Sequence, residues 1–282
     1  MIRLARAVMF AALPAELLVV VLLVSGAPLP APLVVAAEAA VTAAILLEAA
    51  VAVRLYRAAR RGGATRRAAA RAAGDELIPA KVRRIVGFDA KGVASIVLWL
   101  LRRRDGVPPG ATALPYSGEQ RVLMTIMVGV LAVETVAMEL LLAALGASAG
   151  LRGMVLALDL YSILLTLAIA AACATRPHVV TAGELRVRSG AFFDLRIPRS
   201  LITSVRLARN YNEPGMVTVR DGRLGLAVSA QTNVVVELSE PVTAVRPLGA
   251  SAPVRVVRFF TDTPAEAVAA LTAEKRAADP IK

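Results

Sequence analysis

Four stretches of the chain are apolar and long enough to cross a membrane, which constrains the fold more than any other feature of the sequence. They run roughly over residues 7–24, 33–53, 122–145 and 154–173. Each is close to the ~20 residues that a helix needs to span the hydrocarbon core of a bilayer. The chain is 57% hydrophobic, which is too apolar for an ordinary soluble protein. We expect the first stretch to be retained rather than cleaved as a signal peptide, because only a short turn, 25–32, separates it from the second.

The charges of the connecting segments set the expected orientation. Residues 54–121 carry 15 Lys or Arg and five Asp or Glu, whereas the turn 25–32 carries no charge and the turn 146–153 carries only Arg152. The positive-inside rule therefore places 54–121 in the cytoplasm, and four spans place both termini there as well. The formal net charge of +12 then suits the anionic inner leaflet of a membrane, and no nucleic-acid partner is expected.

The chain has one cysteine, Cys173, and one histidine, His178. This excludes an intramolecular disulfide, a cysteine-based metal site and bis-histidine haem ligation within one chain. The sequence also lacks a phosphate-binding loop, a nucleophile elbow and a metal-binding His pair. We expect no metal and no cofactor, and an enzyme is the less favoured class. Of the 33 basic residues 29 are Arg, which together with abundant Ala indicates a bacterial chain in the plasma membrane.

The cytoplasmic segment contains one more apolar run, Val93–Leu101, which is too short to span a membrane. It holds the only tryptophan, Trp99, and is followed by Arg102, Arg103 and Arg104. We expect an interfacial helix with the indole at headgroup level and the arginines on lipid phosphates. The alternative is a helix buried against the C-terminal domain. A Pro- and Gly-rich linker then leads to the third span.

After the fourth span the apolar residues recur with a period of two, which is typical of strands with one buried face. Seven strands separated by turn residues are expected: Leu185–Arg188, Phe192–Ile197, Ile202–Ala208, Val217–Arg220, Leu224–Ser229, Val234–Leu238 and Val254–Phe260. One helix follows from Pro264, with Thr263 and Glu266 forming a capping box. Its Val268 and Leu271 lie on one face and are expected to plug an apolar opening.

Seven short strands and one amphipathic helix form the plan of a pleckstrin-homology (PH) barrel. The stretches ELRVRSGAFFDLRIPRSLITSVR, NVVVELSEPVTAV and VRFFTDTPAEAVAAL resemble the bacterial PH-like domains that follow membrane helices. The whole chain resembles uncharacterised actinobacterial four-helix integral membrane proteins with such a tail. The resemblance implies an α+β membrane protein, with four transmembrane helices and a C-terminal cytoplasmic PH-like β-barrel closed by one helix. The expected parts are a hairpin (1–54), a basic segment (55–121), a second hairpin (122–175) and the PH-like domain (176–282).

Basic residues lie on the first two strands of the tail, where PH domains that bind phosphoinositides hold the headgroup. They are Arg186, Arg188, Arg196 and Arg199. The alternation places Arg186 and Arg188 on the outer face, where guanidinium groups can bind phosphate. Charged residues are also what an outward strand face ordinarily shows, and Asp194 lies within the cluster. Specific headgroup binding and simple attraction to the anionic leaflet both stay open.

Acidic residues inside the predicted spans form a second candidate site, because carboxylates are costly in a membrane. With a rise of about 1.5 Å per residue, each span places one acid in the outer half, and a fifth lies near the middle. They are Glu16, Glu38, Glu139 and Asp159 in the outer half, and Glu134 near the middle. The only basic residue near them is Arg152 at the rim. These acids can hydrogen-bond between helices when protonated, relay protons, or bind a cation.

Two classes of function follow. One is a non-enzymatic, membrane-anchored scaffold or regulatory protein that presents the PH-like domain at the inner leaflet. That domain would contact the lipid bilayer, a protein partner or a second copy of the chain. The other is a small proton- or cation-coupled transporter or channel that uses the carboxylates. The tail favours the first class, because a transporter does not need a barrel.

The orientation can be tested with reporters fused after Lys282. A reporter that is active only in the periplasm is expected to give no signal, and one that is active in the cytoplasm a strong signal, because the basic segment stays on the cytoplasmic side. A strong periplasmic signal contradicts this orientation.

Overall fold

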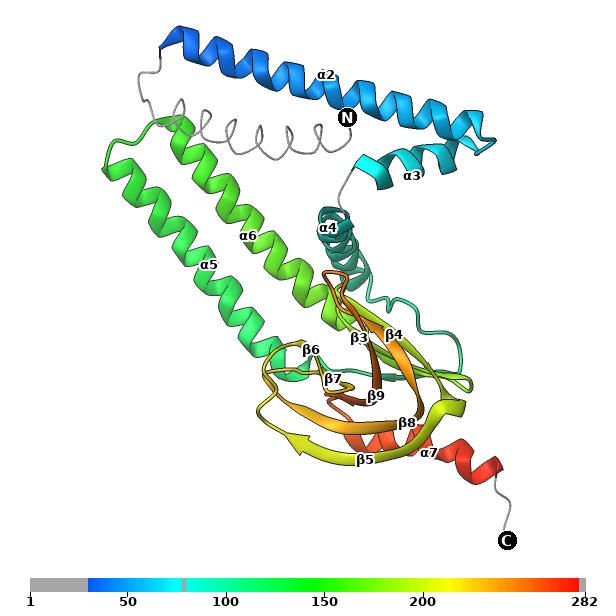
Figure 1. Cartoon of the computed structure of the whole chain (residues 1–282). Coiled ribbons are helices and arrows are strands. Elements are labelled where there is room, and N and C mark those ends of the chain that lie inside the picture. The colour runs from blue at the N-terminus through cyan, green and yellow to red at the C-terminus, as the bar shows by residue number, and fades with distance from the viewer. Residues whose placement is uncertain (1–29, 78–79, 279–282) are drawn as a thin grey trace. The chain divides into compact units, whose positions relative to one another are not determined.

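The computed structural model describes residues 30–77 and 80–278, which form an α+β fold (Figure 1). These residues divide into two compact units. One unit comprises the described residues up to Arg83 together with Glu134–Leu160. The other comprises Arg84–Val133 and the described residues from Tyr161 onward.

Within the first unit, helix α2 (Ala31–Arg61) turns back into helix α3 (Arg66–Leu77). The turn uses Gly63, whose φ of 85° lies in the left-handed region that glycine adopts without strain. Helix α3 contacts α2 through small side chains, and its Ala69 and Ala73 are buried.

Helices α5 (Gly118–Ala144) and α6 (Ala149–Thr175) form an apolar hairpin that contributes to both units. Each has 27 residues and is long and apolar enough to cross a membrane. Among the described residues these two helices, rather than the predicted four, have this character.

The other two predicted spans have different outcomes. The span 7–24 lies outside the described residues. The span 33–53 lies within helix α2, and several of its side chains lie outside the described residues.

A four-stranded antiparallel sheet holds the base of the hairpin. Its order is β1–β2–β3–β4, and its strands are Thr112–Leu114, His178–Val180, Glu184–Ser189 and Phe193–Pro198. Strand β1 precedes α5 and β2 follows α6, so that Leu114 pairs with His178 across the base of the hairpin. The hairpin is therefore an insertion between two paired strands, with three residues or fewer between each strand and its helix.

The second sheet has the order β5–β8–β9–β7–β6. Its strands, in chain order from β5 to β9, are Ile202–Asn210, Val217–Arg220, Arg223–Leu226, Thr232–Val245 and Ser251–Phe259. Strands β7 and β9 are parallel, and the other neighbours are antiparallel. A two-residue turn joins β6 to β7, and its Asp221 and Gly222 have φ of 50° and 70°, as a tight hairpin turn requires.

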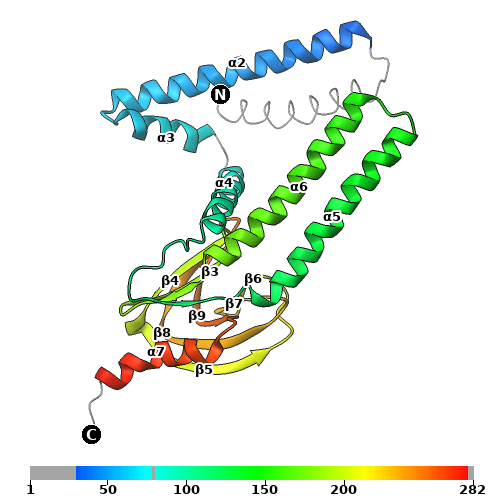
Figure 2. The same ribbon diagram turned by 180° about the vertical axis from the view of Figure 1, so that it is seen from behind.

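Both sheets and helix α7 (Pro264–Ala278) share one apolar core, and we call β1–β9 with α7 the β-domain (Figure 2). In β4, Phe193, Leu195 and Ile197 are buried and alternate with exposed residues, as the period of two predicts. Helix α7 adds Ala267 and Leu271 to this core. These two residues are four apart, so they lie on one helix face.

The predicted closed barrel is wrong, although all seven predicted strands are present as β3–β9. Strands β4 and β5 follow each other in the chain but belong to different sheets, because a 3-10 turn, Arg199–Leu201, redirects the backbone between them. The β-domain also does not begin at 176. Its first strand, β1, lies in the segment that we predicted to be a linker.

Two details of α7 differ from the prediction. Val268 is only half-buried, because the buried face runs through Ala267 and Leu271 instead. The hydroxyl of Thr263 is buried and makes no hydrogen bond within the described part of the chain, so the predicted capping box does not form.

Helix α4 (Ala80–Leu100) covers the predicted interfacial run. From Arg84 onward one face packs on the β-domain and α6: the rings of Phe88 and Phe192 lie 5.3 Å apart, and a Cβ on Gly92 would lie 3.2 Å from that of Ala168. Another face leaves Val93 and Val97 exposed, at 47% and 54%, and Trp99, which follows Gly92 by seven residues and so lies on the α6-facing side, is 55% exposed near the end of the helix. The helix therefore has features of both alternatives, the buried helix and the interfacial one.

The packing of α7 predicts different effects for two matched substitutions. Leu271→Asp places a charge in the core and is expected to cost about 4 kcal/mol of unfolding free energy, whereas Val268→Asp is expected to cost about 1 kcal/mol. Thermal unfolding of the purified full-length protein in detergent measures both. Equal melting temperatures for the two variants contradict the docking of α7.

Candidate functional site

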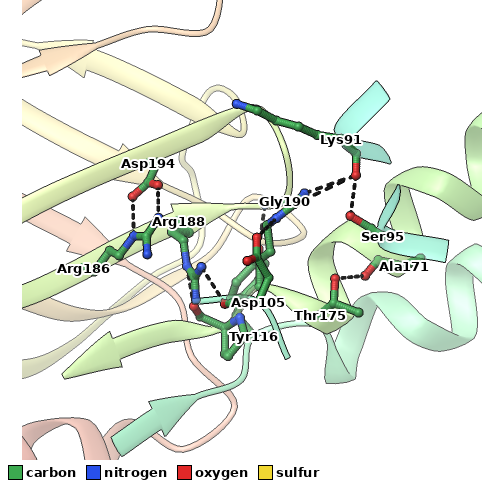
Figure 3. Close-up of polar contacts among 12 residues, drawn as sticks. Lys91, Ser95, Asp105, Tyr116, Ala171, Thr175, Arg186, Arg188, Gly190 and Asp194 are labelled. Atoms are coloured by element: carbon green, nitrogen blue, oxygen red, sulfur yellow. Dashed lines mark hydrogen bonds and ion pairs between the residues drawn. The ribbon is translucent and has the colours of Figure 1, made fainter. Parts of the chain in front are cut away.

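The base of the α5–α6 hairpin holds a group of polar side chains, most of them buried, and this group is the candidate site. Its members come from the loop after α4, the segment before α5, the residues that follow α6, and strand β3. They are Asp105, Tyr116, Arg176, His178 and Arg188, which we call the junction cluster. Figure 3 shows the contacts of Asp105, Tyr116 and Arg188.

His178 is the first residue of β2 and is 2% exposed. The backbone N–H of Arg188 donates to its Nδ1 at 2.9 Å, so Nδ1 is an acceptor and the ring proton lies on Nε2. That Nε2 donates to the carbonyl of Phe260 at 2.9 Å. The ring stacks on Tyr116 with centroids 4.6 Å apart and meets Phe259 edge-on. The imidazole is thus held as one neutral tautomer.

Burial decides the protonation of both rings. It lowers the pKa of His178 from 6.5 to about 4, although the hydrogen bond to Phe260 acts in the opposite direction. Burial also raises the pKa of Tyr116 well above its usual value of 10. Neither group changes its charge near neutral pH, so neither is suited to general acid–base chemistry there.

Arg188 is the largest departure from the predicted headgroup cluster. The alternation of β3 places it on the outer face, yet the residue is 2% exposed, because the loop after α4 covers this end of the strand. Its Nε donates to the carbonyl of Pro177 at 2.8 Å and its Nη1 to that of Asp105 at 2.9 Å. Burial and the nearby charge of Arg186 lower its pKa. Arg188 therefore donates to backbone carbonyls from a buried position, and its Nη2 has no hydrogen-bond partner among the described residues.

Asp105 connects the loop after α4 to the end of α6. Its backbone N–H donates to the carbonyl of Thr175 at 2.8 Å, and its carboxylate accepts a hydrogen bond from Nε of Arg176, also at 2.8 Å. The next residue, Gly106, has a φ of 63°, and a Cβ there would lie 2.7 Å from Nη1 of Arg186. This turn therefore requires glycine.

The start of α5 is held from two sides. The hydroxyl of Tyr116 accepts a hydrogen bond from the N–H of Gly190 at 2.6 Å. The carboxylate of Asp262, in the loop between β9 and α7, accepts one from the N–H of Gly118 at 2.9 Å. This caps the first turn of α5 from a distant part of the chain, and a negative charge at a helix N-terminus is favourable.

The junction cluster is thus built to hold segments together. Its charged and polar groups bind backbone groups at the ends of α5 and α6, and its one histidine is neutral. The described residues contain no group of three or more His, Cys, Asp or Glu side chains that could hold a metal ion.

The other predicted headgroup residues have separate environments. Arg186 pairs with Asp194, its Nε lying 2.8 Å from Oδ1. Arg196 lies 3.6 Å from Glu184. The guanidinium of Arg199 donates to backbone carbonyls, including that of Leu271 at 2.9 Å, and so fastens α7 to the first sheet. The exposed members of the set are Arg196, Trp99, Arg102, Arg103 and Arg104.

The predicted acidic cluster is only partly covered by the described residues. Glu16 and the side chain of Glu38 lie outside them. Glu134 is exposed and Asp159 is half-buried. Glu139 forms an ion pair with Arg152, whose Nε lies 2.9 Å from its Oε1. Arg152, which the sequence placed at the rim of this set, is thus a direct partner of Glu139, because the short turn between α5 and α6 brings the two residues together.

Sequence reasoning missed Asp105, Tyr116 and Arg176, and it assigned no role to His178. One signal for a polar cluster was available: Arg176 and His178 follow the apolar residues of a predicted span within a few positions. The long-range partners, at Asp105 and Phe260, had no local signal.

Comparison with known proteins gives no relative. Neither a scan against protein-family models nor searches of curated proteins and of solved structures finds a match to this chain.

His178 makes stability depend on pH in a window that can be assigned to one residue, because it is the only histidine. Its pKa is about 4 when folded and returns to about 6.5 on unfolding. Between these values the unfolded chain binds more protons, so the stabilisation is complete above about pH 6.5 and is lost as the pH falls toward 4. We expect a loss of about 2 kcal/mol between pH 7 and pH 5.

Urea unfolding of the full-length protein, followed by circular dichroism, measures this loss. The variant His178→Gln is expected to be less stable at pH 7 but to vary less between pH 7 and pH 5. An unchanged pH slope in that variant assigns the effect to other groups.

Proposed function

We propose that the chain is a non-enzymatic, membrane-anchored scaffold or regulatory protein that presents a PH-like domain at the inner leaflet. The observation that carries this proposal is the pairing of β1 with β2 across the base of the apolar hairpin. A domain tethered by a flexible linker needs no such ladder. An anchor that begins and ends inside a sheet holds that sheet at a fixed place beside the membrane.

Helix α4 supports a location at the membrane surface. It exposes Val93 and Val97 on one face and Trp99 near its C-terminal end, and it is followed by the exposed residues Arg102, Arg103 and Arg104. Apolar and indole side chains next to arginines are suited to the interface of an anionic leaflet. In this proposal α4 is an interfacial helix that also packs on the β-domain.

The open edges of the second sheet support a role in binding protein. Strand β5 is one edge of that sheet, and its Leu207 is 57% exposed. An edge strand offers backbone hydrogen bonds to a strand of a partner or of a second copy. We propose that the β-domain engages a protein through β5.

The transport alternative rested on carboxylates without cationic partners. The ion pair between Glu139 and Arg152 removes one of them from that set, because its carboxylate already has a basic partner. We therefore place the scaffold ahead of the transporter.

The proposal can be tested by cross-linking and mild-detergent purification from bacterial membranes, comparing the parent with Leu207→Glu and Leu248→Glu. Both leucines are exposed, at 57% and 60%, but only Leu207 lies on the edge strand. We expect a protein or a second copy to be recovered with the parent and with Leu248→Glu, and at least fivefold less with Leu207→Glu, because the new charge must be desolvated at the interface. Recovery of no protein in stoichiometric amount, or equal recovery with both variants, contradicts the proposal.

A further inference from the structure

A cavity of about 420 Å³ lies between α4, α5 and α6, on the hairpin side of the junction cluster. Its volume is within the range of about 300–1,000 Å³ that small-molecule sites occupy. All of its lining residues belong to the unit that contains the β-domain. The junction cluster does not line it, so it is a separate feature.

Small side chains on α6 create this space. Ala170, Ala171 and Ala174 line it from α6, and alanine side chains do not reach across to α5. From α4, the lining includes Trp99, the only tryptophan of the chain.

The wall contributed by α5 is polar at one end and apolar at the other. Ser117, Gln120 and Arg121 line the end next to the base of the hairpin, and Met124 and Val128 line the part further along the helix. Ser117 lies just before α5, and Arg121, Met124 and Val128 follow it at spacings of four, three and four, so they lie along one face. The polarity of the cavity thus changes along the axis of a helix that is long and apolar enough to cross a membrane.

Arg121 gives the polar end a positive charge. Its residue is exposed, and no ion pair joins its guanidinium to a carboxylate among the described residues. A guanidinium binds phosphate oxygens with two hydrogen bonds. A ligand with a phosphate and a long apolar chain complements both ends of this cavity.

We propose that the cavity is a binding site for one anionic phospholipid of the inner leaflet, with an acyl chain between α4, α5 and α6 and the phosphate on Arg121. This inference rests on the proposed location of the hairpin in a membrane. It differs from general attraction to the leaflet in requiring both a particular arginine and the space beside the alanines.

Trp99 is a built-in reporter for this site, because bromine on an acyl chain quenches tryptophan fluorescence only at short range. The full-length protein is reconstituted in phosphatidylcholine vesicles, and brominated phosphatidylglycerol or brominated phosphatidylcholine is added at increasing mole fractions. We expect phosphatidylglycerol to quench Trp99 at a lower mole fraction and to saturate. Glycerol phosphate, which has the charge without the chain, is expected not to compete.

Two pairs of variants separate the site from its surroundings. Arg121→Gln is expected to reduce the phosphatidylglycerol preference about fivefold, whereas Arg103→Gln, which removes an equal charge outside the cavity, is expected to leave it nearly unchanged. Ala174→Phe fills the cavity and is expected to abolish saturable quenching. Ala157→Phe, on the same helix but outside the cavity, is the matched control.

Flotation of the vesicles is measured first. Protein that does not float with them overturns both this inference and the membrane location. If the protein floats but both lipids quench Trp99 equally, the lipid site alone is overturned. The same holds if Arg121→Gln and Arg103→Gln reduce the phosphatidylglycerol preference by equal amounts. If the protein floats and neither lipid quenches Trp99, no acyl chain lies in the cavity. This result also overturns the site.

Discussion

The antiparallel ladder between β1 and β2 is the constraint on which the rest of the structure depends. It joins Thr112–Leu114 to His178–Val180 across the whole length of the inserted hairpin. Backbone N–H and C=O groups next to apolar helices have little water to bind, and the ladder satisfies them within the protein. Because three residues or fewer separate each strand from its helix, the ladder also fixes where α5 begins and α6 ends.

The junction cluster follows from this constraint. A helix ends with carbonyls that have no partner within it, and the immediate start of β2 leaves no room for a longer cap. Donors from elsewhere satisfy the backbone here: the N–H of Asp105 binds the carbonyl of Thr175, and the guanidinium of Arg188 binds that of Pro177. Positive groups are favourable at a helix C-terminus. This explains a buried arginine whose partners are carbonyls, beside a histidine that burial keeps neutral.

The sequence predicted local elements better than long-range ones. Strand β6 was predicted with its observed bounds, and β3 and β4 to within one residue, because alternation and turn residues are local signals. Strand β1 was missed because three residues in a Pro- and Gly-rich segment carry no pattern, and its partner follows the hairpin. The same limit applies to the site. Alternation places Arg188 outside, and only the loop that covers it reverses that prediction. The apolar hairpin itself could be predicted, whereas its ion pair between Glu139 and Arg152 depends on how the turn closes.

The two interpretations of α4, interfacial or buried, describe two faces of one helix. On the inner face, a Cβ on Gly92 would lie only 3.2 Å from that of Ala168, and Ser95 is fully buried. Helices come this near only through small side chains. On the outer face, Val93 and Val97 stay exposed, and an apolar face that lies beside a membrane-length hairpin is more stable against lipid than against water. In the proposed membrane location, the contacts that hold α4 on α6 also set the depth of this outer face.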